Sequence, residues 1–275
     1  MTERLAELAR RWRVTVDLSI DTASSTIAYA RRGDEPVVLK VVKQPGDEWR
    51  SGDVLRAFDG RGMVRVFEHV DGAVLLERLD PASPLVDLAQ RGDDEMATAI
   101  LCDVIRAMEP RAAPAWCPTV RDWAKGFGRY MTSGDRRIAP NLVARAERCF
   151  RTLCDSQREP RLLHGDLHHS NVLFDRDRGW VAIDPKGVIG EPEYEVGAAL
   201  RNPVECPELI GDRVILERRL TMYVSRLVLD RQRVIGWGFA QAVLSAIWDV
   251  EDGHVVDDAS SALGLAAALL PMLDE

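Results

Sequence analysis

The 275-residue sequence lacks the long apolar segment of a membrane-spanning protein. Its longest apolar run covers residues 262–273, twelve residues that include Gly264 and Pro271, whereas a spanning helix needs about 20. Residues 1–8 alternate charged with small apolar residues, so the apolar core of a signal peptide is missing there too. We therefore expect a cytoplasmic protein with no membrane partner.

The sequence is also poor in cysteine. Its five cysteines form no C-x-x-C pair and show no zinc-ligand spacing with the histidines. An odd number of cysteines in a chain without an export signal favours reduced, mostly buried thiols over a disulfide framework.

Basic residues are in the minority, since 36 Lys and Arg against 44 Asp and Glu give a net charge of −8. The excess is concentrated from Pro185 onwards, where fifteen acidic residues face eight basic ones. An acidic chain binds polyanions poorly, so nucleic acid is not expected as the main partner. Acidic clusters suit a cationic small molecule, although a solvated acidic surface would explain the same composition.

The pattern of apolar residues changes once along the chain, near Pro81. Strand-length segments come before it, and segments of helical period come after it. This order predicts an α+β, bilobal fold, with a small β-rich N-terminal lobe (1–79), a larger, mainly helical C-terminal lobe (80–275) and a cleft between them. The expected strands of the first lobe cover residues 14–20, 25–30, 36–42, 64–70 and 73–79. The expected helices of the second lobe lie near residues 94–108, 120–131, 142–153, 211–229, 232–250 and 257–269.

Lys40 stands out in the N-terminal lobe because it interrupts an apolar, β-branched strand, where an unpaired ammonium is costly to bury. Either Lys40 reaches solvent from an edge strand, or it has an anionic partner in a cleft. Glu48, in a predicted helix over residues 47–56, is the best candidate for that partner. The loop at residues 21–25 has no glycine, so the glycine loop of protein kinases is absent. Its small and hydroxyl residues could still approach phosphate oxygens through backbone N–H groups.

The residues with the clearest chemistry lie between positions 162 and 187, where two strand-length apolar runs each end on polar groups. Asp166 and Asn171 are five residues apart, and Asp184 follows eighteen residues after Asp166. This order, H-x-D-x-x-x-x-N and then two apolar residues and Asp, is that of the catalytic loop and metal-binding segment of protein-kinase-like phosphotransferases.

Phosphoryl transfer depends on positioning and on charge neutralisation, and the candidate residues divide these tasks. Asn171 and Asp184 offer the oxygen ligands that suit Mg²⁺. Asp166 would accept a proton from the acceptor hydroxyl, or orient it. Lys40 would hold the α- and β-phosphates, with Glu48 fixing its rotamer.

Two further contacts with the nucleotide are expected. The backbone between Glu77 and Leu79 lies where the two lobes would join, and it could hydrogen-bond an adenine edge. His168, two residues after Asp166, is a candidate for a γ-phosphate contact, although histidine is only partly charged at pH 7.

The acidic C-terminal third holds the candidates for binding a cationic acceptor. Carboxylates at the end of the predicted helix 232–250 are unfavourable beside its negative dipole end. This conflict fits a cation-binding site, although a solvent loop would tolerate it as well. The candidate acceptor residues are Glu191, Glu193, Trp248, Asp249, Glu251 and Asp252.

The segments His164–Asn171 and Ile183–Glu191 together resemble the aminoglycoside phosphotransferases, in the branch of streptomycin 6-phosphotransferase and hydroxyurea kinase. In that branch Pro, here Pro185, follows the metal-binding Asp. The resemblance implies a bilobal protein-kinase-like fold, ATP with Mg²⁺, and transfer of the γ-phosphate to a drug hydroxyl. D-F-G and A-P-E motifs are absent, so a protein substrate is not expected.

The resemblance leads to one main hypothesis and two alternatives. The main hypothesis is ATP-dependent phosphorylation of a hydroxyl on an aminoglycoside of streptomycin type, conferring resistance, by a monomer or weak dimer. One alternative is a kinase of the same fold that acts on another small molecule, such as hydroxyurea. The other is a non-catalytic ATP-binding regulatory module.

Overall fold

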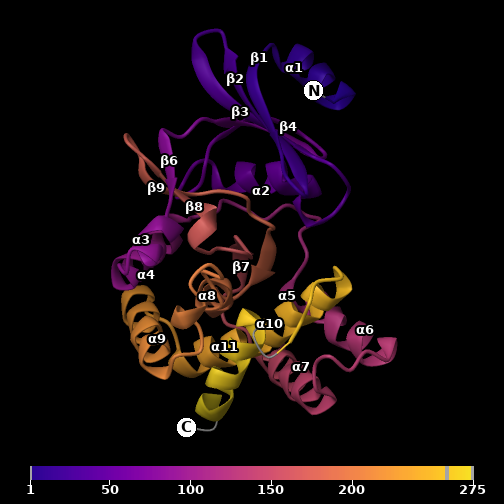
Figure 1. Cartoon of the computed structure of the whole chain (residues 1–275), viewed down its shortest axis with the longest axis vertical. Coiled ribbons are helices and arrows are strands. Elements are labelled where there is room, and N and C mark those ends of the chain that lie inside the picture. Colours follow the sequence, from indigo (N-terminus) through magenta and orange to yellow (C-terminus); the bar gives the residue numbers. More distant parts are fainter. Residues whose placement is uncertain (1, 258–259, 274–275) are drawn as a thin grey trace. The chain divides into compact units, whose positions relative to one another are not determined.

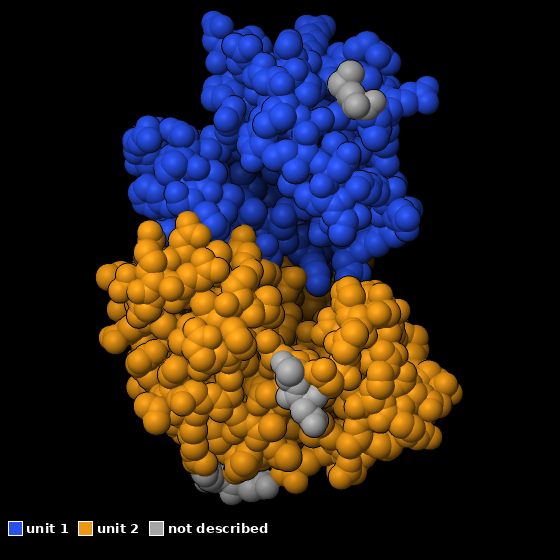
Figure 2. Space-filling view, in the orientation of Figure 1, with its two compact units in different colours: residues 1–84, 104–115, 171–187 blue, residues 85–103, 116–170, 188–275 orange. Residues whose placement is uncertain are grey.

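The computed structural model describes residues 2–257 and 260–273, and the chain divides into two compact units (Figure 2). Unit 1 comprises residues 1–84, 104–115 and 171–187, and unit 2 comprises residues 85–103, 116–170 and 188–275. Both units are therefore assembled from separate stretches of chain. The simpler division into residues 1–79 and 80–275 stays a prediction.

An antiparallel sheet with the strand order β1-β2-β3-β5-β4 forms most of unit 1. Helix α1 (Glu3–Trp12) packs against it (Figure 1), and its Leu5, Leu8 and Trp12 join a buried core with sheet residues such as Leu39 and Leu75. The five predicted strands are all present, with β5 ending two residues earlier than expected. Their bounds are β1 (Thr15–Asp21), β2 (Ser25–Arg32), β3 (Glu35–Val42), β4 (Val66–Val70) and β5 (Ala73–Glu77).

A second, three-stranded sheet explains why residues 171–187 belong to unit 1. Its order is β6-β8-β9, so β8 (Val172–Asp175) pairs with both β6 (Pro81–Pro84) and β9 (Gly179–Ala182). The predicted helix over residues 47–56 is a 3₁₀ turn, η1 (Asp47–Arg50), followed by α2 (Ser51–Phe58).

Unit 2 is mainly helical and is organised around α10 (Arg231–Glu251), which is buried along most of its length. Helix α10 packs against α7, α8 and α11 (Figure 1). The other helices of the chain are α3 (Val86–Gln90), α4 (Asp94–Ala107), α5 (Val120–Trp123), α6 (Lys125–Ser133), α7 (Pro140–Asp155), α8 (Pro192–Leu200), α9 (Arg213–Leu227) and α11 (Ser261–Leu269). The remaining elements are β7 (Arg161–Leu163), η2 (His169–Asn171), β10 (Val188–Gly190), η3 (Pro207–Leu209) and η4 (Leu270–Leu273).

Acidic N-caps start the two long helices of the C-terminal third. Asp212 Oδ1 accepts hydrogen bonds of 2.9 Å from the N–H groups of Val214 and Ile215, and Asp230 caps α10 in the same way. Such a cap satisfies N–H groups that have no partner within the helix, which stabilises it by about 1 kcal/mol.

Most helices lie where the sequence predicts them, and so does the burial of the cysteines. The predicted helix 120–131 is two helices, α5 and α6, and the start of the predicted helix 257–269 includes residues 258 and 259, which lie outside the described part of the chain. None of the five cysteines takes part in a disulfide bond, and all except Cys149 are buried, as predicted. In the described residues, no helix is both long and apolar enough to cross a membrane.

Candidate active site

Lys40 lies on β3, the middle strand of the five-stranded sheet, so it is not an edge-strand lysine. Its side chain is only 9% exposed, and its Nζ is 2.7 Å from Glu48 Oε2 and 2.8 Å from Asp184 Oδ1. Burial on its own would lower the pKa of Lys40, but the nearby carboxylates of Asp184 and Glu48 outweigh it and the pKa is raised. The ammonium therefore stays charged, and the predicted Lys40–Glu48 pair is present.

Asp184 follows β9 in a backbone conformation that few side chains adopt. Its φ is 56°, in the left-handed region, which aspartate tolerates better than most residues. Gly187, three residues on, has φ 79°, and a Cβ there would lie 2.5 Å from Val54 Cγ2. Strained backbone of this kind concentrates at functional sites, where it fixes the direction of one side chain.

Asn171 is tied to the same segment through the main chain. Its carbonyl oxygen accepts a hydrogen bond of 2.9 Å from the N–H of Ile183, the residue just before Asp184. Asn171 and Asp184 therefore lie at the adjacent ends of the β8–β9 hairpin, within unit 1.

A recess that is partly open to solvent leads to Lys40 and Asp184, and the described residues that line it all belong to unit 1. Aliphatic side chains from both sheets of the unit and from the segments beside them form its walls: Ile27, Val38, Val64, Leu76, Leu173 and Ile183. The guanidinium of Arg78 lies over the ring of Tyr29, 5.0 Å from its centroid. An aliphatic slot with one charged end suits a flat base that carries an anionic tail.

The segment Glu77–Leu79 also lines this recess. The N–H of Glu77 donates to Arg65 O at 3.0 Å, and its carboxylate is paired with Arg178 and Arg65. Leu79 lies beyond the ladder, which ends at the Val37–Glu77 pair, so its main-chain groups take no part in sheet pairing. Leu79 is therefore better placed than Glu77 for the predicted main-chain contact with a base.

The loop that carries Asp166 belongs to unit 2, and Glu195 of α8 fixes its main chain. Glu195 is buried and accepts hydrogen bonds from the N–H groups of His164, at 2.7 Å, and Gly165, at 3.0 Å. Burial raises the pKa of Glu195 to about 7, against the opposing effect of these two donors. Gly165 has φ 83°, so the sharp turn before Asp166 depends on glycine.

The carboxylate of Asp166 is bound by a guanidinium. Arg201 Nη2 lies 3.0 Å from Asp166 Oδ1, and Arg201 Nη1 donates to Gln241 Oε1 at 3.0 Å. The amide N–H of Asp166 donates to His164 Nδ1 at 3.3 Å. Asp166 is thus held by both its main chain and its side chain.

Two neighbouring histidines of this loop have different surroundings. His168 is partly exposed, and its Nδ1 accepts the N–H of Ser170 at 3.3 Å. The contact of His168 with a phosphate stays a prediction. His169 is 1% exposed, and neither ring nitrogen has a hydrogen-bond partner in the described residues. Burial, with a smaller effect of the nearby Arg219, lowers the pKa of His169 to about 3.

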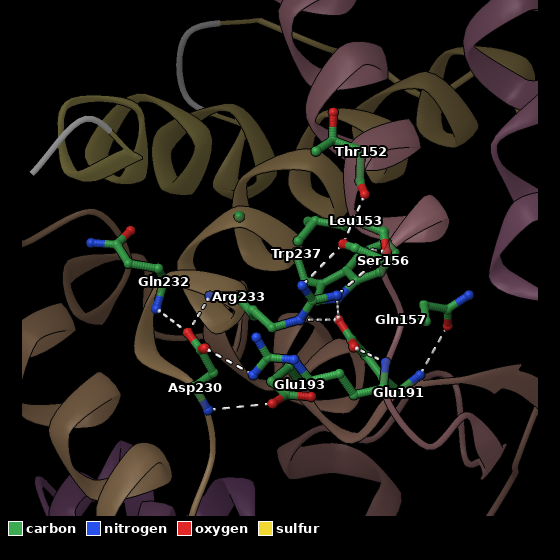
Figure 3. A network of polar contacts seen from close by, with 12 residues as sticks. Thr152, Leu153, Ser156, Gln157, Glu191, Glu193, Asp230, Gln232, Arg233 and Trp237 are labelled. Atoms are coloured by element: carbon green, nitrogen blue, oxygen red, sulfur yellow. Dashed lines mark hydrogen bonds and ion pairs between the residues drawn. The ribbon is translucent and has the colours of Figure 1, made fainter.

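Glu191 has a structural role in unit 2 (Figure 3). Its side chain is 0% exposed, and Oε1 lies 2.6 Å from Arg233 Nη2 and also accepts the indole N–H of Trp237. Oε2 accepts the main-chain N–H of Arg158 at 3.0 Å. Glu191 is therefore not accessible to an acceptor, contrary to the prediction.

Glu193 is buried as well, and its Oε1 accepts the main-chain N–H of Asp230 at 3.3 Å (Figure 3). Both glutamates were predicted to bind a cationic acceptor, whereas Glu191 and nearly all of α8, which follows it, are buried. A buried position removes Glu193 from the candidate acceptor residues too.

The four remaining acceptor candidates lie together at the end of α10. Trp248 is half-buried and packs edge to face with Trp123, with ring centroids 5.6 Å apart. Glu251 is paired with Arg129 through two hydrogen bonds of 2.9 Å each. Asp249 Oδ1 is 3.5 Å from His254 Nδ1, and Asp252 is exposed as the C-cap residue of α10.

Sequence reasoning missed four residues of this site: Trp123, Glu195, Arg201 and Gln241. Each stands outside the recognisable motif and is brought in by helix packing. The one signal available in the sequence was Gln241, a glutamine inside an apolar helix. Gln241 is buried, and a buried amide needs a hydrogen-bond partner.

Comparison with known proteins gives a consistent result. A family model described as aminoglycoside/hydroxyurea antibiotic resistance kinase matches residues 11–253. The chain is 37% identical to the streptomycin 3''-kinase of Klebsiella pneumoniae over 251 residues, 88% of this chain and 91% of that protein. It is 30% identical to the streptomycin 6-kinase of Streptomyces griseus, over 96% of this chain and 88% of that protein. It is 33% identical to the hydroxyurea phosphotransferase of Kitasatospora aureofaciens, over 92% and 74%.

Solved structures share the fold at low sequence identity. A ternary complex of aminoglycoside phosphotransferase APH(4)-Ia with ADP and hygromycin B has a TM-score of 0.68 and 17% identity, over 98% of both chains. The choline kinase LicA from Streptococcus pneumoniae has a TM-score of 0.62 and 13% identity, over 99% of both chains. The predicted α+β, protein-kinase-like fold is thereby confirmed.

The fold, and the relatives that share it, define this protein as a small-molecule phosphotransferase. Within that class the chain belongs to the aminoglycoside/hydroxyurea antibiotic resistance kinase family, which confirms the resemblance seen in its sequence.

Proposed function

We propose that this protein transfers the γ-phosphate of ATP to a hydroxyl of an aminoglycoside of streptomycin type and so confers resistance. The observation that carries this proposal is the buried Lys40, held between Glu48 and Asp184 at the end of an aliphatic recess. The similarity to two streptomycin kinases supports the choice of acceptor. A cytoplasmic location, where ATP is available, and a monomeric or weakly dimeric state belong to the same proposal.

In the proposed reaction the base of ATP occupies the recess of unit 1, and Leu79 provides its main-chain contact. The ammonium of Lys40 binds the α- and β-phosphates, and Glu48 keeps its rotamer fixed. Neutralising phosphate charge in a partly desolvated site is the main electrostatic task of such an enzyme. The related structure with bound ADP is consistent with this assignment.

The oxygen ligands of unit 1 fit Mg²⁺. Asn171 and Asp184 offer an amide and a carboxylate oxygen, and the Asn171–Ile183 hydrogen bond ties their segments together. In the described residues, no group of three or more His, Cys, Asp or Glu could hold a metal ion. Two protein ligands suit Mg²⁺, which otherwise takes phosphate oxygens and water, and its charge would neutralise the phosphates.

Asp166 is the proposed catalytic residue for the acceptor hydroxyl. Its carboxylate would orient the hydroxyl toward the γ-phosphate and accept its proton as the new bond forms. His168 stays a candidate for a contact with the transferred phosphate.

One face of α10 supports a large cationic acceptor. Gln241, which binds Arg201, shares this face with Ser245, Trp248 and Asp252, because positions four, seven and eleven apart lie on the same side of a helix. From Gln241 to Trp248 the helix rises about 10 Å at about 1.5 Å per residue. The ring of Trp248 and the carboxylate of Asp252, at this distance along the helix from Gln241, suit an extended molecule that carries both ring faces and cationic groups.

Hydroxyurea is the second candidate acceptor, because a hydroxyurea phosphotransferase is 33% identical over 92% of this chain. Hydroxyurea has no cationic group and is too small to reach Trp248 and Asp252 at once. The two candidates therefore predict different consequences for changes at the end of α10.

The test is MgATP turnover over a panel that contains streptomycin, other aminoglycosides and hydroxyurea, with product masses recorded. The proposal expects an aminoglycoside to gain one phosphoryl group and Asp166→Asn to abolish most of the turnover. Phosphorylation of hydroxyurea alone would support the second candidate. MgATP binding without turnover on any acceptor would favour a non-catalytic regulatory module.

A further inference from the structure

Arg201 binds the side chain of the proposed catalytic aspartate and follows the last residue of α8 as its C-cap. Its Nη2 lies 3.0 Å from Asp166 Oδ1, and its side chain is 11% exposed. A guanidinium has a fixed planar geometry, so it restricts the direction of a carboxylate more strongly than a flexible ammonium does.

Arg201 is itself held by a buried partner. Its Nη1 donates to Gln241 Oε1 at 3.0 Å, and Gln241 is 2% exposed within α10. Gln241 has little freedom to move, because it packs against Gly197, where even a Cβ would lie 1.9 Å from Oε1. The guanidinium of Arg201 therefore bridges the rigid amide of Gln241 and the carboxylate of Asp166.

Helix α8 thus reaches the Asp166 loop from two positions. Glu195 accepts the N–H groups of His164 and Gly165, which fixes the main chain before Asp166. Arg201, six residues later, fixes the carboxylate. The two contacts leave Asp166 with one main-chain path and one preferred rotamer.

We propose that Arg201 is a positioning residue, which acts through Asp166 and holds its carboxylate in the rotamer that receives the acceptor hydroxyl. Gln241 and Gly197 support it by keeping the guanidinium in place. The proposal rests on the proposed function in one respect, the role of Asp166 in the transfer. A positioning role differs from a merely structural role, because the effect of Arg201 on kcat should vanish once Asp166 is replaced.

A double-mutant cycle separates these roles. Arg201→Gln keeps most of the side-chain volume and removes the guanidinium, and misplacing a catalytic group by about 1 Å can lower a rate about 100-fold. We expect kcat to fall by about 10- to 100-fold in Arg201→Gln, and no further fall when the change is added to Asp166→Asn. The dissociation constant for MgATP should stay within about twofold, since the recess belongs to unit 1. Added guanidinium should partly restore kcat in Arg201→Ala.

Arg226→Gln is the matched control, an arginine on the surface of α9 that lies 3.7 Å from Asp103. Its kcat should equal that of the unchanged protein. The proposal is overturned if Arg201→Gln keeps kcat within about twofold of the unchanged protein. It is also overturned if Arg201→Gln lowers kcat by the same factor in the unchanged protein and in Asp166→Asn.

A crystal structure of Arg201→Gln gives a readout that needs no acceptor, so it separates this proposal from the proposed function. We expect the Asp166 side chain to occupy more than one rotamer, while the Glu195 contacts with His164 and Gly165 persist. An unchanged Asp166 rotamer would overturn the proposal even if turnover were absent for another reason. If Arg201→Gln does not fold, Arg201→Lys is subject to the same two measurements.

Discussion

Lys40 Nζ lies 2.8 Å from Asp184 Oδ1, which joins the middle strand of the five-stranded sheet to the segment after β9. Both residues belong to unit 1, together with Asn171 and the aliphatic recess. One compact unit therefore contains the groups proposed to bind MgATP, apart from the candidate phosphate contact of His168. The groups proposed to act on the acceptor belong to unit 2.

Replacing Lys40 by Met should remove the main phosphate contact in unit 1. We expect kcat/KM for ATP to fall by about 100-fold or more, because one electrostatic donor at a phosphoryl-transfer site has about that effect. The measurement is steady-state turnover with saturating acceptor. Lys125→Met is the control, since Lys125 is exposed on α6. Among the described residues it forms an ion pair only with Asp122, at the surface. Equal kinetics of the two variants would contradict the assignment of Lys40.

Removing Mg²⁺ with a chelator should abolish turnover, and Asp184→Asn should raise the Mg²⁺ concentration needed for half-maximal rate. The reason is that a neutral amide is a weaker ligand than a carboxylate for a hard cation. A magnesium titration of the initial rate measures this. Asp249→Asn, on unit 2, should leave the magnesium titration unchanged. If Asp184→Asn gives the same titration curve as the unchanged protein, Asp184 is not the metal ligand.

Replacing Glu191 by Ala should destabilise unit 2 strongly. The change leaves the buried guanidinium of Arg233 without its carboxylate and removes the acceptor of the Trp237 indole N–H. Breaking a buried ion pair from one side lowers the free energy of unfolding by about 3–5 kcal/mol. Urea unfolding measures it, with Glu251→Ala as the control, because its exposed pair with Arg129 contributes about 1 kcal/mol or less. A small loss for Glu191→Ala would show that the network is not structural.

His169 should make the folded state less stable in acid. Its pKa is lowered from 6.5 to about 3 by burial, so between these pH values the unfolded chain binds a proton that the folded chain does not. Stability from this group is fully present above pH 6.5 and declines as the pH falls toward 3, by about 1.4 kcal/mol per pH unit. Unfolding free energies of the unchanged protein and His169→Asn should therefore converge or cross as the pH falls. Equal slopes of the unfolding free energy against pH in the two proteins would contradict this role of His169.

Trp248→Ala should raise KM for an aminoglycoside by about tenfold and leave KM for ATP unchanged. Loss of an aromatic contact with a desolvated cationic ligand is worth about 1–2 kcal/mol. Steady-state kinetics with each substrate varied in turn provide the measurement. Exposed Met131→Ala on α6 is the control, and an unchanged KM in Trp248→Ala would exclude the end of α10 from the acceptor site.

The sequence was most informative where chemistry depends on order along the chain. Asp166, Asn171 and Asp184 could be predicted from their spacing alone, and Lys40 from its conflict with an apolar strand. The structure settled the remaining choice for Lys40 by showing it on a middle strand with two carboxylates.

Acidic composition was a poor guide, because it cannot separate buried from exposed carboxylates. Glu191 and Glu193 were predicted to meet the acceptor, but α8 is buried and both side chains have structural partners. Arg201 and Gln241 could not be found for a related reason. Each acts through tertiary packing between α8 and α10, and only the glutamine within an apolar helix gave a sign of this packing in the sequence.

The most direct test of the account is the initial rate of ADP formation with MgATP and streptomycin, compared between the unchanged protein and Asp166→Asn. The account predicts streptomycin-dependent ADP formation, phosphorylated streptomycin as product, and a rate at least about 100-fold lower in Asp166→Asn. Equal streptomycin-dependent rates in the two proteins would contradict the assignment of Asp166. No streptomycin-dependent ADP formation in the unchanged protein would contradict the proposed acceptor.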